Sequence, residues 1–434
     1  MNNNTLLSFH AQVVKDINER LVLKLIQEHE IISSSDLVKS TGMRPSTIFN
    51  ILKGLSAKSF VTMHGKGEST SKGGKKPYTW ALNKDAAYVI GLDIEVGEMT
   101  AVVLDFSGGL IAKKIMKLDT GRTADELSEK IITVVSQVII ENNIDSEKIL
   151  GLGVAFSGIV DYQKGIVVLS SVLPEMNFPL LDKLSSLPFP VAIENNANAA
   201  AIGLKWSGKE KIKTKSNYIT VLVEIDKNVS GLGIGIVING ELYRGASFCA
   251  GELYPHLPTL KEILSTVRSK FIESEIFKNY ITSFETIDIA FLLDAAKKGD
   301  ELAKSVFSMI GNLVGQTITQ AVALLNPDTL IITGIVSEVE DVIIKAVRKE
   351  IEMRVISITS NALEIIVDKR HQYSVAFGAA SLILEDFFRL PVRMHKNTEE
   401  TNNFVDSTEE VDQQVNVVSM HEPVPLTDAT SGNQ

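Results

Sequence analysis

The sequence predicts an α/β protein with a small basic module at its amino terminus, a large body of alternating strands and helices, and an acidic tail. Residues 1–90 carry 12 Lys and Arg against 7 Asp and Glu, whereas the rest of the chain carries 31 against 46. Helical periodicity dominates to about residue 57, and strand and helix patterns follow one another from residue 87. The 434 residues suffice for two to three domains with ample cores.

Composition excludes several classes of protein. The 44% hydrophobic and 22% charged content is ordinary for a globular protein, and no apolar run is long enough to cross a membrane. The start of the chain lacks the basic and apolar regions of a signal peptide. Cys249 is the only cysteine, which excludes an intrachain disulfide and a cysteine-rich zinc site. We therefore expect a cytoplasmic protein without a bound metal.

Three short helical patterns near the amino terminus predict a helix-turn-helix. The first covers about residues 17–28; the second begins near Ser33, which has capping-box spacing to Asp36, and stops at Gly42. The third begins at Pro45, a residue suited to a first helical position, and has one apolar face. Its opposite face presents Arg44, Ser46, Thr47, Asn50 and Lys53. A short turn followed by an exposed polar helix face is typical of a helix that reads the DNA major groove.

The segment after the third helix predicts a wing. Strands are expected at residues 60–63 and 78–82, joined by a Gly/Ser/Lys loop that ends in Gly73-Gly74-Lys75-Lys76-Pro77. Glycines let the backbone approach DNA, and Lys75 and Lys76 suit contacts to phosphates. Double-stranded operator DNA is therefore the expected partner of this module. Charge alone would also fit a solvated lysine loop, and the helices alone would fit a dimerisation module.

The body carries four polar or glycine-rich segments at the ends of predicted strands. A hairpin of residues 88–94 and 99–105 turns through Asp93-Ile94-Glu95-Val96-Gly97-Glu98, and a buried strand leads into Ser157-Gly158. A second apolar run leads into Ile193-Glu194-Asn195-Asn196-Ala197-Asn198, which opens a helix of small residues. Glycines alternate in Ser230–Gly235, either to contact a phosphate or to permit tight packing.

The segment Glu194-Asn195-Asn196-Ala197-Asn198 resembles the Glu-Asn-Asp-Ala-Asn signature of the ROK family, which contains bacterial sugar kinases and sugar-responsive transcription factors. In the kinases of that family the Asp takes the proton from the sugar hydroxyl that attacks ATP. Asn196 stands at that position here. A carboxamide cannot act as a general base near neutral pH, although it can hold a sugar hydroxyl. The resemblance therefore favours a sensor over a catalyst.

Two further segments depart from the kinase pattern. The kinase phosphate turn runs Asp-Ile-Gly-Gly-Thr-Lys, and Glu95, Val96 and Glu98 here would repel or obstruct a polyphosphate. Residues 245–256 resemble the family's Gly-Ala-Gly-Glu-Ile-Gly-His, whose Glu and His bind sugar hydroxyls. Glu252 matches, but Tyr254 and Pro255 replace the Gly-His pair and His256 comes one residue late. The cysteine cluster that binds zinc in many members is absent.

The resemblance extends from about residue 12 to residue 388 and implies a domain organisation. A winged helix-turn-helix is expected at residues 1–84, followed by a two-lobed body of the actin-like, ribonuclease-H-like ATPase type. The first lobe would comprise residues 85–198 with 370–390, and the second residues 199–369. Residues 391–434, with 2 basic and 8 acidic side chains, are expected to be disordered.

The resemblance also implies a binding site between the lobes, without a catalytic residue or a cofactor. The residues expected to hold a sugar or sugar derivative are Ser157, Gly158, Asn195, Asn196, Glu252, Tyr254 and His256. The sequence thus predicts a sugar-responsive transcriptional regulator, a repressor that acts as a dimer or tetramer. A ROK sugar kinase fused to a DNA-binding module, and a DNA-binding regulator whose sugar site has decayed, remain as alternatives.

Overall fold

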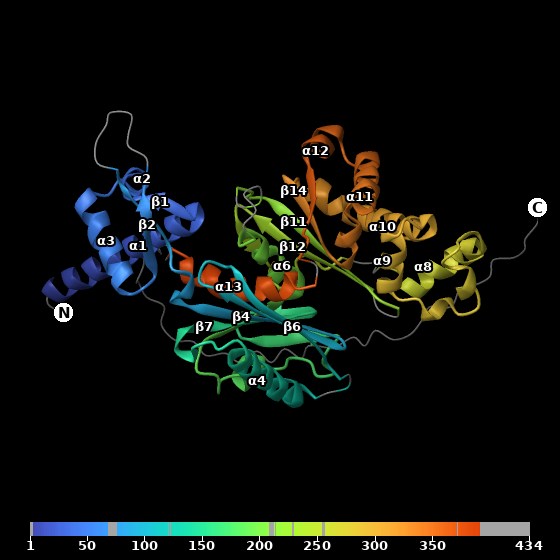
Figure 1. The fold of residues 1–434 in the computed structure, drawn as a ribbon, viewed down its shortest axis with the longest axis horizontal. Coiled ribbons are helices and arrows are strands. Elements are labelled where there is room, and N and C mark those ends of the chain that lie inside the picture. Colours follow the sequence, from blue (N-terminus) through green and yellow to red (C-terminus); the bar gives the residue numbers. More distant parts are fainter. Residues whose placement is uncertain are drawn as a thin grey trace, which may run out of the picture. The chain divides into compact units, whose positions relative to one another are not determined.

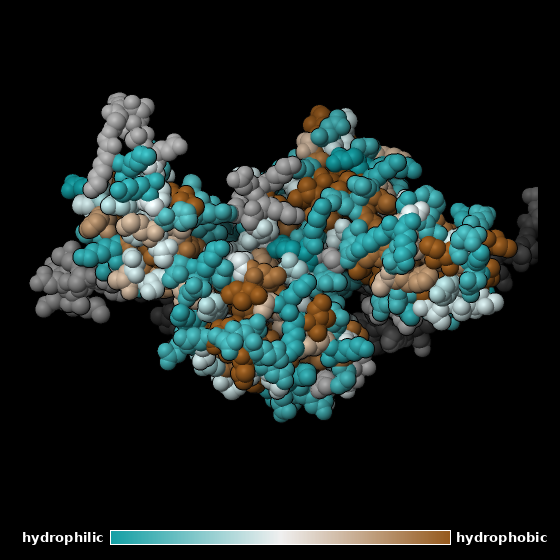
Figure 2. Space-filling model, viewed as in Figure 1, coloured by the Kyte–Doolittle hydropathy of each residue, from teal (hydrophilic) through white to brown (hydrophobic). Residues whose placement is uncertain are grey.

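The computed structural model in Figure 1 describes residues 3–67, 76–119, 121, 123–207, 212, 214–227, 230–253, 257–370 and 372–390, with side chains from residue 15 onward. The tail expected at residues 391–434 lies outside these residues. No helix in the described part of the chain is long and apolar enough to cross a membrane. On the side of the molecule drawn in Figure 2, hydrophilic residues are interspersed with several groups of apolar ones, one of them over α12.

The amino-terminal module combines three helices with a small sheet. Its helices are α1 (Asn3–His29), α2 (Ser34–Thr41) and α3 (Pro45–Ala57). The sheet has the order β1-β3-β2 and contains β1 (Ile31–Ser33), β2 (Val61–Lys66) and β3 (Tyr78–Leu82), all antiparallel. The Ser33 side chain caps α2 by accepting a hydrogen bond from the Asp36 N–H at 3.1 Å. Gly42 ends α2 in the left-handed conformation, with φ of 68°, which a glycine adopts without strain.

The first sheet of the body has the order β10-β7-β4-β5-β6. Its antiparallel part is β4 (Tyr88–Glu95), β5 (Glu98–Asp105) and β6 (Leu110–Lys117), and β7 (Ile149–Phe156) and β10 (Val191–Asn195) run parallel to β4. Helix α4 (Ala124–Glu141) packs on one face and α13 (Ser374–Phe388) on the other (Figure 1). A hairpin of β8 (Gly158–Asp161) and β9 (Ile166–Ser170) and the short α5 (Leu180–Lys183) precede β10.

The second sheet repeats this arrangement, in the order β13-β12-β11-β14-β15. Strands β11 (Tyr218–Ile225), β12 (Ser230–Ile238) and β13 (Glu241–Tyr243) are antiparallel, and β14 (Thr329–Gly334) and β15 (Glu364–Val367) run parallel to β11. Its helices are α8 (Leu260–Val267), α9 (Ile289–Lys297), α10 (Glu301–Leu325), α11 (Glu340–Arg354) and α12 (Ser357–Ala362). Short 3-10 helices occupy residues 84–86, 146–148, 268–273, 278–280, 284–286 and 335–339.

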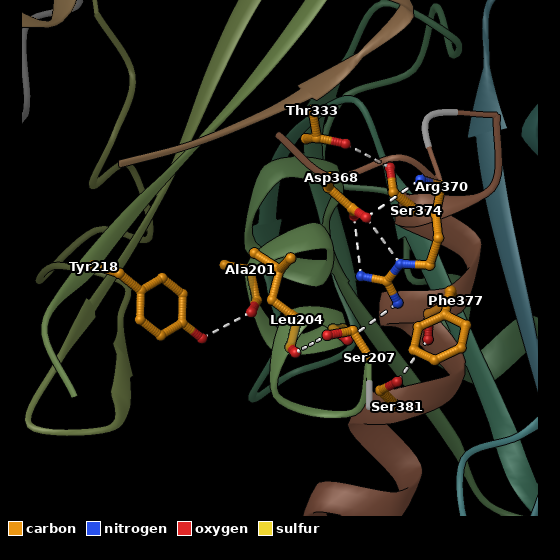
Figure 3. A network of polar contacts seen from close by, with 11 residues as sticks. Ala201, Leu204, Ser207, Tyr218, Thr333, Asp368, Arg370, Ser374, Phe377 and Ser381 are labelled. Atoms are coloured by element: carbon orange, nitrogen blue, oxygen red, sulfur yellow. Dashed lines mark hydrogen bonds and ion pairs between the residues drawn. The ribbon is translucent and has the colours of Figure 1, made fainter. Parts of the chain in front are cut away.

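Helix α6 (Asn196–Lys205) lies between the second sheet and α13, and nearly all of its residues are buried. A Cβ at Gly378 of α13 would lie 1.8 Å from the Ala199 carbonyl oxygen, so the two helices are in backbone contact. In the polar network of Figure 3, the Tyr218 hydroxyl of β11 donates to the Ala201 carbonyl at 2.9 Å. Arg370, which follows β15, donates to the Gly203 carbonyl of α6 at 3.2 Å. These contacts hold α6 against both halves of the body.

An aromatic cluster joins the amino-terminal module to the body. It consists of Phe60, Phe106, Trp206, Phe387 and Phe388. Phe60, which follows α3, stacks on Phe106 with ring centroids 5.4 Å apart. Trp206, the residue after α6, lies 5.5 Å from Phe388 at the end of α13. The module and the two central helices of the body therefore share one apolar contact.

Candidate functional site

The Asn195 side chain ties the start of α6 to the β8 hairpin. Its oxygen caps α6 by accepting from the Asn198 N–H at 3.1 Å, and its Nδ2 donates to the Gly158 carbonyl at 2.8 Å. Ser157 lies beside this contact, and its carbonyl accepts from the Ser170 hydroxyl at 2.7 Å. Three residues predicted from the sequence to hold sugar, Ser157, Gly158 and Asn195, are thus brought together.

The Asn196 side chain faces the second sheet. Its Nδ2 donates to Glu224 Oε1 of β11 at 2.8 Å, and its oxygen accepts from the Ala197 N–H at 2.8 Å. Asn196 is buried, at 5% exposure. Asn196 is the first residue of α6, directly after β10 of the first sheet, and Glu224 lies on β11 of the second, so this hydrogen bond joins the segment that leaves the first sheet to the second sheet.

Glu224 belongs to a carboxyl cluster with Asp93, Glu95 and Glu98. Glu95 and Glu98 pair directly across the two-residue turn that joins β4 to β5. Burial, followed by the charges of Glu95 and Glu224, raises the pKa of Asp93 well above its ordinary range, and Asp93 Oδ1 accepts no hydrogen bond from the described residues. Burial and the charge of Glu95 raise the pKa of Glu224 to about 8, although the hydrogen bond from Asn196 lowers it. The described part of the chain includes no group of three or more His, Cys, Asp or Glu placed to bind a metal ion.

The carboxyl cluster is poorly suited to a nucleotide. The turn where a kinase would hold ATP phosphates carries Glu95 and Glu98, with the side chain of Val96 47% exposed between them. A polyphosphate there would meet carboxylates where phosphate-binding turns provide backbone N–H groups and cations. Asn195 and Asn196 place two carboxamides beside this cluster, and position 196, where the kinases have their base, carries no ionisable side chain.

The glycines of β12 serve packing. A Cβ at Gly233 would lie 2.8 Å from the Ala197 Cβ, and a Cβ at Gly235 would lie 2.5 Å from the Ala197 carbonyl oxygen. Helix α6 therefore approaches β12 as closely as backbone contact allows. The sequence left two interpretations of Ser230–Gly235, contact with a phosphate or tight packing, and Gly233 and Gly235 fit the second.

Glu252 follows Gly251, whose backbone lies close against β12 of the second sheet. A Cβ at the preceding Gly251 would lie 1.9 Å from the Ile234 carbonyl, between the two glycines that contact Ala197. The Glu252 N–H donates to the Cys249 carbonyl at 3.2 Å, and the residue is exposed. Tyr254 and His256 lie outside the described residues, so their predicted role stays a prediction.

Sequence reasoning missed an ion pair beside the candidate site. The carboxylate of Glu194, 2% exposed, accepts from Arg244 Nε at 2.7 Å, and the Arg244 guanidinium lies 4.1 Å from the centre of the Tyr162 ring. Glu194 and Arg244 are 50 residues apart in sequence. No local pattern pairs them, because the contact depends on how the two halves of the body meet.

On the amino-terminal module, the predicted DNA-contacting residues share one face of α3. Ser46, Asn50 and Lys53 are exposed, as is Arg44 just before the helix, and Thr47 is half-buried. Sequence reasoning did not include Phe49, which is 66% exposed on this helix. Lys76 is exposed two residues before β3, whereas Lys75 lies outside the described residues.

Comparisons with known proteins bear on the family and the fold of the chain. The sequence matches the ROK family over residues 89–262 and 271–386. The xylose repressor of Caldicellulosiruptor bescii is 27% identical over 414 residues, which cover 90% of this chain and 99% of that protein. A ROK family transcriptional regulator homologous to the Escherichia coli MLC protein superimposes with a TM-score of 0.69 at 20% identity, covering 87% of this chain and 98% of that one.

A kinase of similar fold is also among the solved structures. The ROK family glucokinase of Streptomyces griseus, in complex with glucose and AMPPNP, superimposes with a TM-score of 0.57 at 22% identity, covering 68% of this chain and 99% of that one. The mixed α/β body is therefore common to regulators and kinases. Because the family match covers both sheets and α13, the resemblance predicted from the sequence is confirmed, and the chain belongs to the ROK family.

Proposed function

We propose that this protein is a sugar-responsive transcriptional repressor without kinase activity. Its amino-terminal module binds operator DNA as a winged helix-turn-helix, and a sugar bound between the two halves of the body releases it. The observation that carries this proposal is the pairing of Asn196 with Glu224 beside the carboxyl cluster. This arrangement keeps hydrogen-bonding groups for hydroxyls and lacks both the general base and a phosphate-binding turn.

The arrangement of the amino-terminal module supports DNA binding. Helix α3 follows α2 after a three-residue turn and exposes Ser46, Asn50 and Lys53 on one side, while β2 and β3 form the two strands of a wing. Polar and basic side chains on the second helix of such a pair contact base edges and phosphates in the major groove. The module also has a net positive charge, with 12 basic against 7 acidic residues through residue 90, in a chain whose net charge is −10.

Helix α6 supplies a route from the sugar site to the amino-terminal module. It begins at the Asn195 and Asn196 side chains and ends at Trp206, which contacts Phe388 in the aromatic cluster. The same cluster includes Phe60, which lies between α3 and β2. A sugar that binds one arrangement of the body more tightly would therefore change how the DNA-binding module packs on the body. By thermodynamic linkage, the sugar would then change the affinity of the protein for its operator.

The effector is proposed to be an uncharged sugar, with xylose the first to test, because the Caldicellulosiruptor bescii relative is named a xylose repressor. The carboxyl cluster beside Asn196 consists of acidic groups and offers no cation to pair with a phosphate ester, which disfavours a phosphorylated sugar. We further propose a homodimer, which would present two recognition helices to a palindromic operator. Exposed apolar side chains that would suit a partner surface occur at Met353, Ile356 and Ile358.

The decisive experiment measures operator release by sugar. A labelled duplex from the regulatory region beside the gene is titrated with the protein, and xylose, glucose, N-acetylglucosamine and their phosphates are then added. The proposal expects specific DNA binding that at least one uncharged sugar weakens. ATP consumption over the same panel tests the kinase alternative. Specific DNA binding with neither release nor a thermal shift for any sugar would favour a regulator whose sugar site has decayed.

A further inference from the structure

Three segments of the proposed sugar site converge on Arg244. The residue follows β13 in the second half of the body, and its Nε donates to Glu194 Oε2 at 2.7 Å in the first half. The other carboxylate oxygen of Glu194 accepts from the Asn195 N–H and from Asn198 Nδ2, both at 3.0 Å. Glu194 thus joins Arg244 to the segment that carries the two carboxamides of the site.

Arg244 also contacts the β8 hairpin through an aromatic ring. Its guanidinium lies 4.1 Å from the centre of the Tyr162 ring, and Tyr162 follows the strand whose Gly158 carbonyl accepts from Asn195. The face of an aromatic ring attracts a cation, and the planar guanidinium suits this stacking better than an ammonium group does. Arg244 therefore connects β10 and the β8 hairpin from the opposite half of the body.

The third segment is the loop that carries Glu252. Arg244 begins this loop, and its carbonyl accepts from the Ala250 N–H at 3.2 Å, which closes the loop on itself. Phe248 within the loop packs edge-on against Tyr162, with centroids 5.8 Å apart. Phe248 has a φ of 63°, an uncommon conformation for a bulky side chain that persists only where the surroundings enforce it.

We propose that Arg244 is a positioning residue of the sugar site and that its stack on Tyr162 holds the Glu252 loop against the Asn195–Asn196 segment when sugar binds. This inference rests on the proposed function, and it assigns Arg244 no contact with the sugar. The guanidinium is committed to Glu194 and Tyr162, and its side chain is only 19% exposed. Loss of the stack should weaken sugar binding without touching the DNA-contacting face of α3.

The test compares single variants in operator release by xylose, glucose and N-acetylglucosamine, using the sugar that releases the wild-type protein. Tyr162→Leu removes the ring at a residue that is 38% exposed, so folding should survive. We expect the sugar concentration for half-release to rise about three- to tenfold. Operator affinity without sugar should stay unchanged. Tyr162→Phe keeps the ring and should behave as wild type, as should Tyr243→Leu, a matched control that removes an exposed aromatic beside Arg244.

A double variant separates positioning from direct contact. Arg244→Lys keeps the charge beside Glu194 and loses the planar stack, so adding Tyr162→Leu to it should shift the midpoint no further. The inference would be overturned if the midpoint shifts of Arg244→Lys and Tyr162→Leu were additive in the double variant. It would also be overturned if Tyr162→Leu left the midpoint unchanged, or if Tyr162→Phe shifted it as much as Tyr162→Leu. In each of these cases the wild-type protein would still respond to sugar. A wild-type protein that no sugar releases from its operator would instead overturn the proposed function, and this inference with it.

Discussion

Replacing Trp206 by Leu tests whether α6 carries the sugar signal to the DNA-binding module. The Trp206 side chain is 7% exposed, its ring lies 5.5 Å from Phe388, and its Nε1 donates to Glu385 Oε2 at 3.2 Å. Phe388 in turn lies 5.3 Å from Phe106, which stacks on Phe60. Leucine has neither the ring nor the donor, so the substitution removes the contact between the end of α6 and the aromatic cluster.

The expected size of the effect follows from the interactions of the Trp206 side chain. An aromatic pair contributes about 0.5–1.5 kcal/mol beyond its buried area, and a hydrogen bond to a charged group about 1.5–3 kcal/mol. Coupling between two binding sites is typically about 1–3 kcal/mol, which corresponds to about a 5- to 150-fold change in affinity. The free energy of the Trp206 ring packing and hydrogen bond together is therefore as large as the whole coupling free energy between the sugar site and the DNA-binding module. We expect Trp206→Leu to abolish most of the sugar-dependent change in operator affinity.

The assay is fluorescence anisotropy of a labelled operator with and without saturating sugar, together with calorimetry of sugar binding to DNA-free protein. Trp206→Leu should bind sugar normally and yet remain on DNA. Phe291→Leu is the matched control, because Phe291 packs with Phe277 and Tyr280 in a separate aromatic group of the second half. A folded Trp206→Leu protein that sugar releases as fully as wild type would refute transmission through α6.

Four further predictions concern the two sites. Changing Lys75 and Lys76 to Ala should weaken binding to every duplex and reduce the slope of log affinity against log salt by about 0.9 per lost phosphate contact; a salt titration that leaves the slope unchanged would contradict the wing. Asn196→Asp should not phosphorylate sugar, because Glu95 and Glu98 still repel ATP, and a coupled ATP assay that detects sugar phosphate would disprove this. Glu252→Ala should raise the half-release sugar concentration about ten- to hundredfold, and an unchanged midpoint would remove Glu252 from the site. Glu224 holds its proton more tightly when folded, since its pKa is raised to about 8, so its contribution to stability is present at acidic pH and is lost as pH rises through that value. Between the ordinary pKa of 4.5 and the raised value of about 8, the free energy of unfolding should fall by up to about 1.4 kcal/mol per pH unit. Urea melts of Glu224→Gln should show a smaller decline over the same pH range, and identical pH profiles for the variant and the wild-type protein would contradict the assignment.

The amino-terminal elements could be predicted because their signals are local. Ser33 caps α2, Gly42 ends it in the left-handed conformation, and Pro45 begins α3, so each signal is satisfied within a few residues. Strand β1 (Ile31–Ser33) was not predicted. Its three residues are too few to show an alternating pattern, and they form a strand only because β3 provides the partner.

The sequence by itself determined the family, the mixed α/β body and the replacement of the kinase base by Asn196, because these follow from the order of residues in short motifs. Only the tertiary structure decided which side chains face those motifs. Glu224 reaches Asn196 across 28 residues, and Arg244 reaches Glu194 across 50. Such partners depend on strand order and on the packing of two sheets against α6 and α13, and no single segment of sequence encodes that packing.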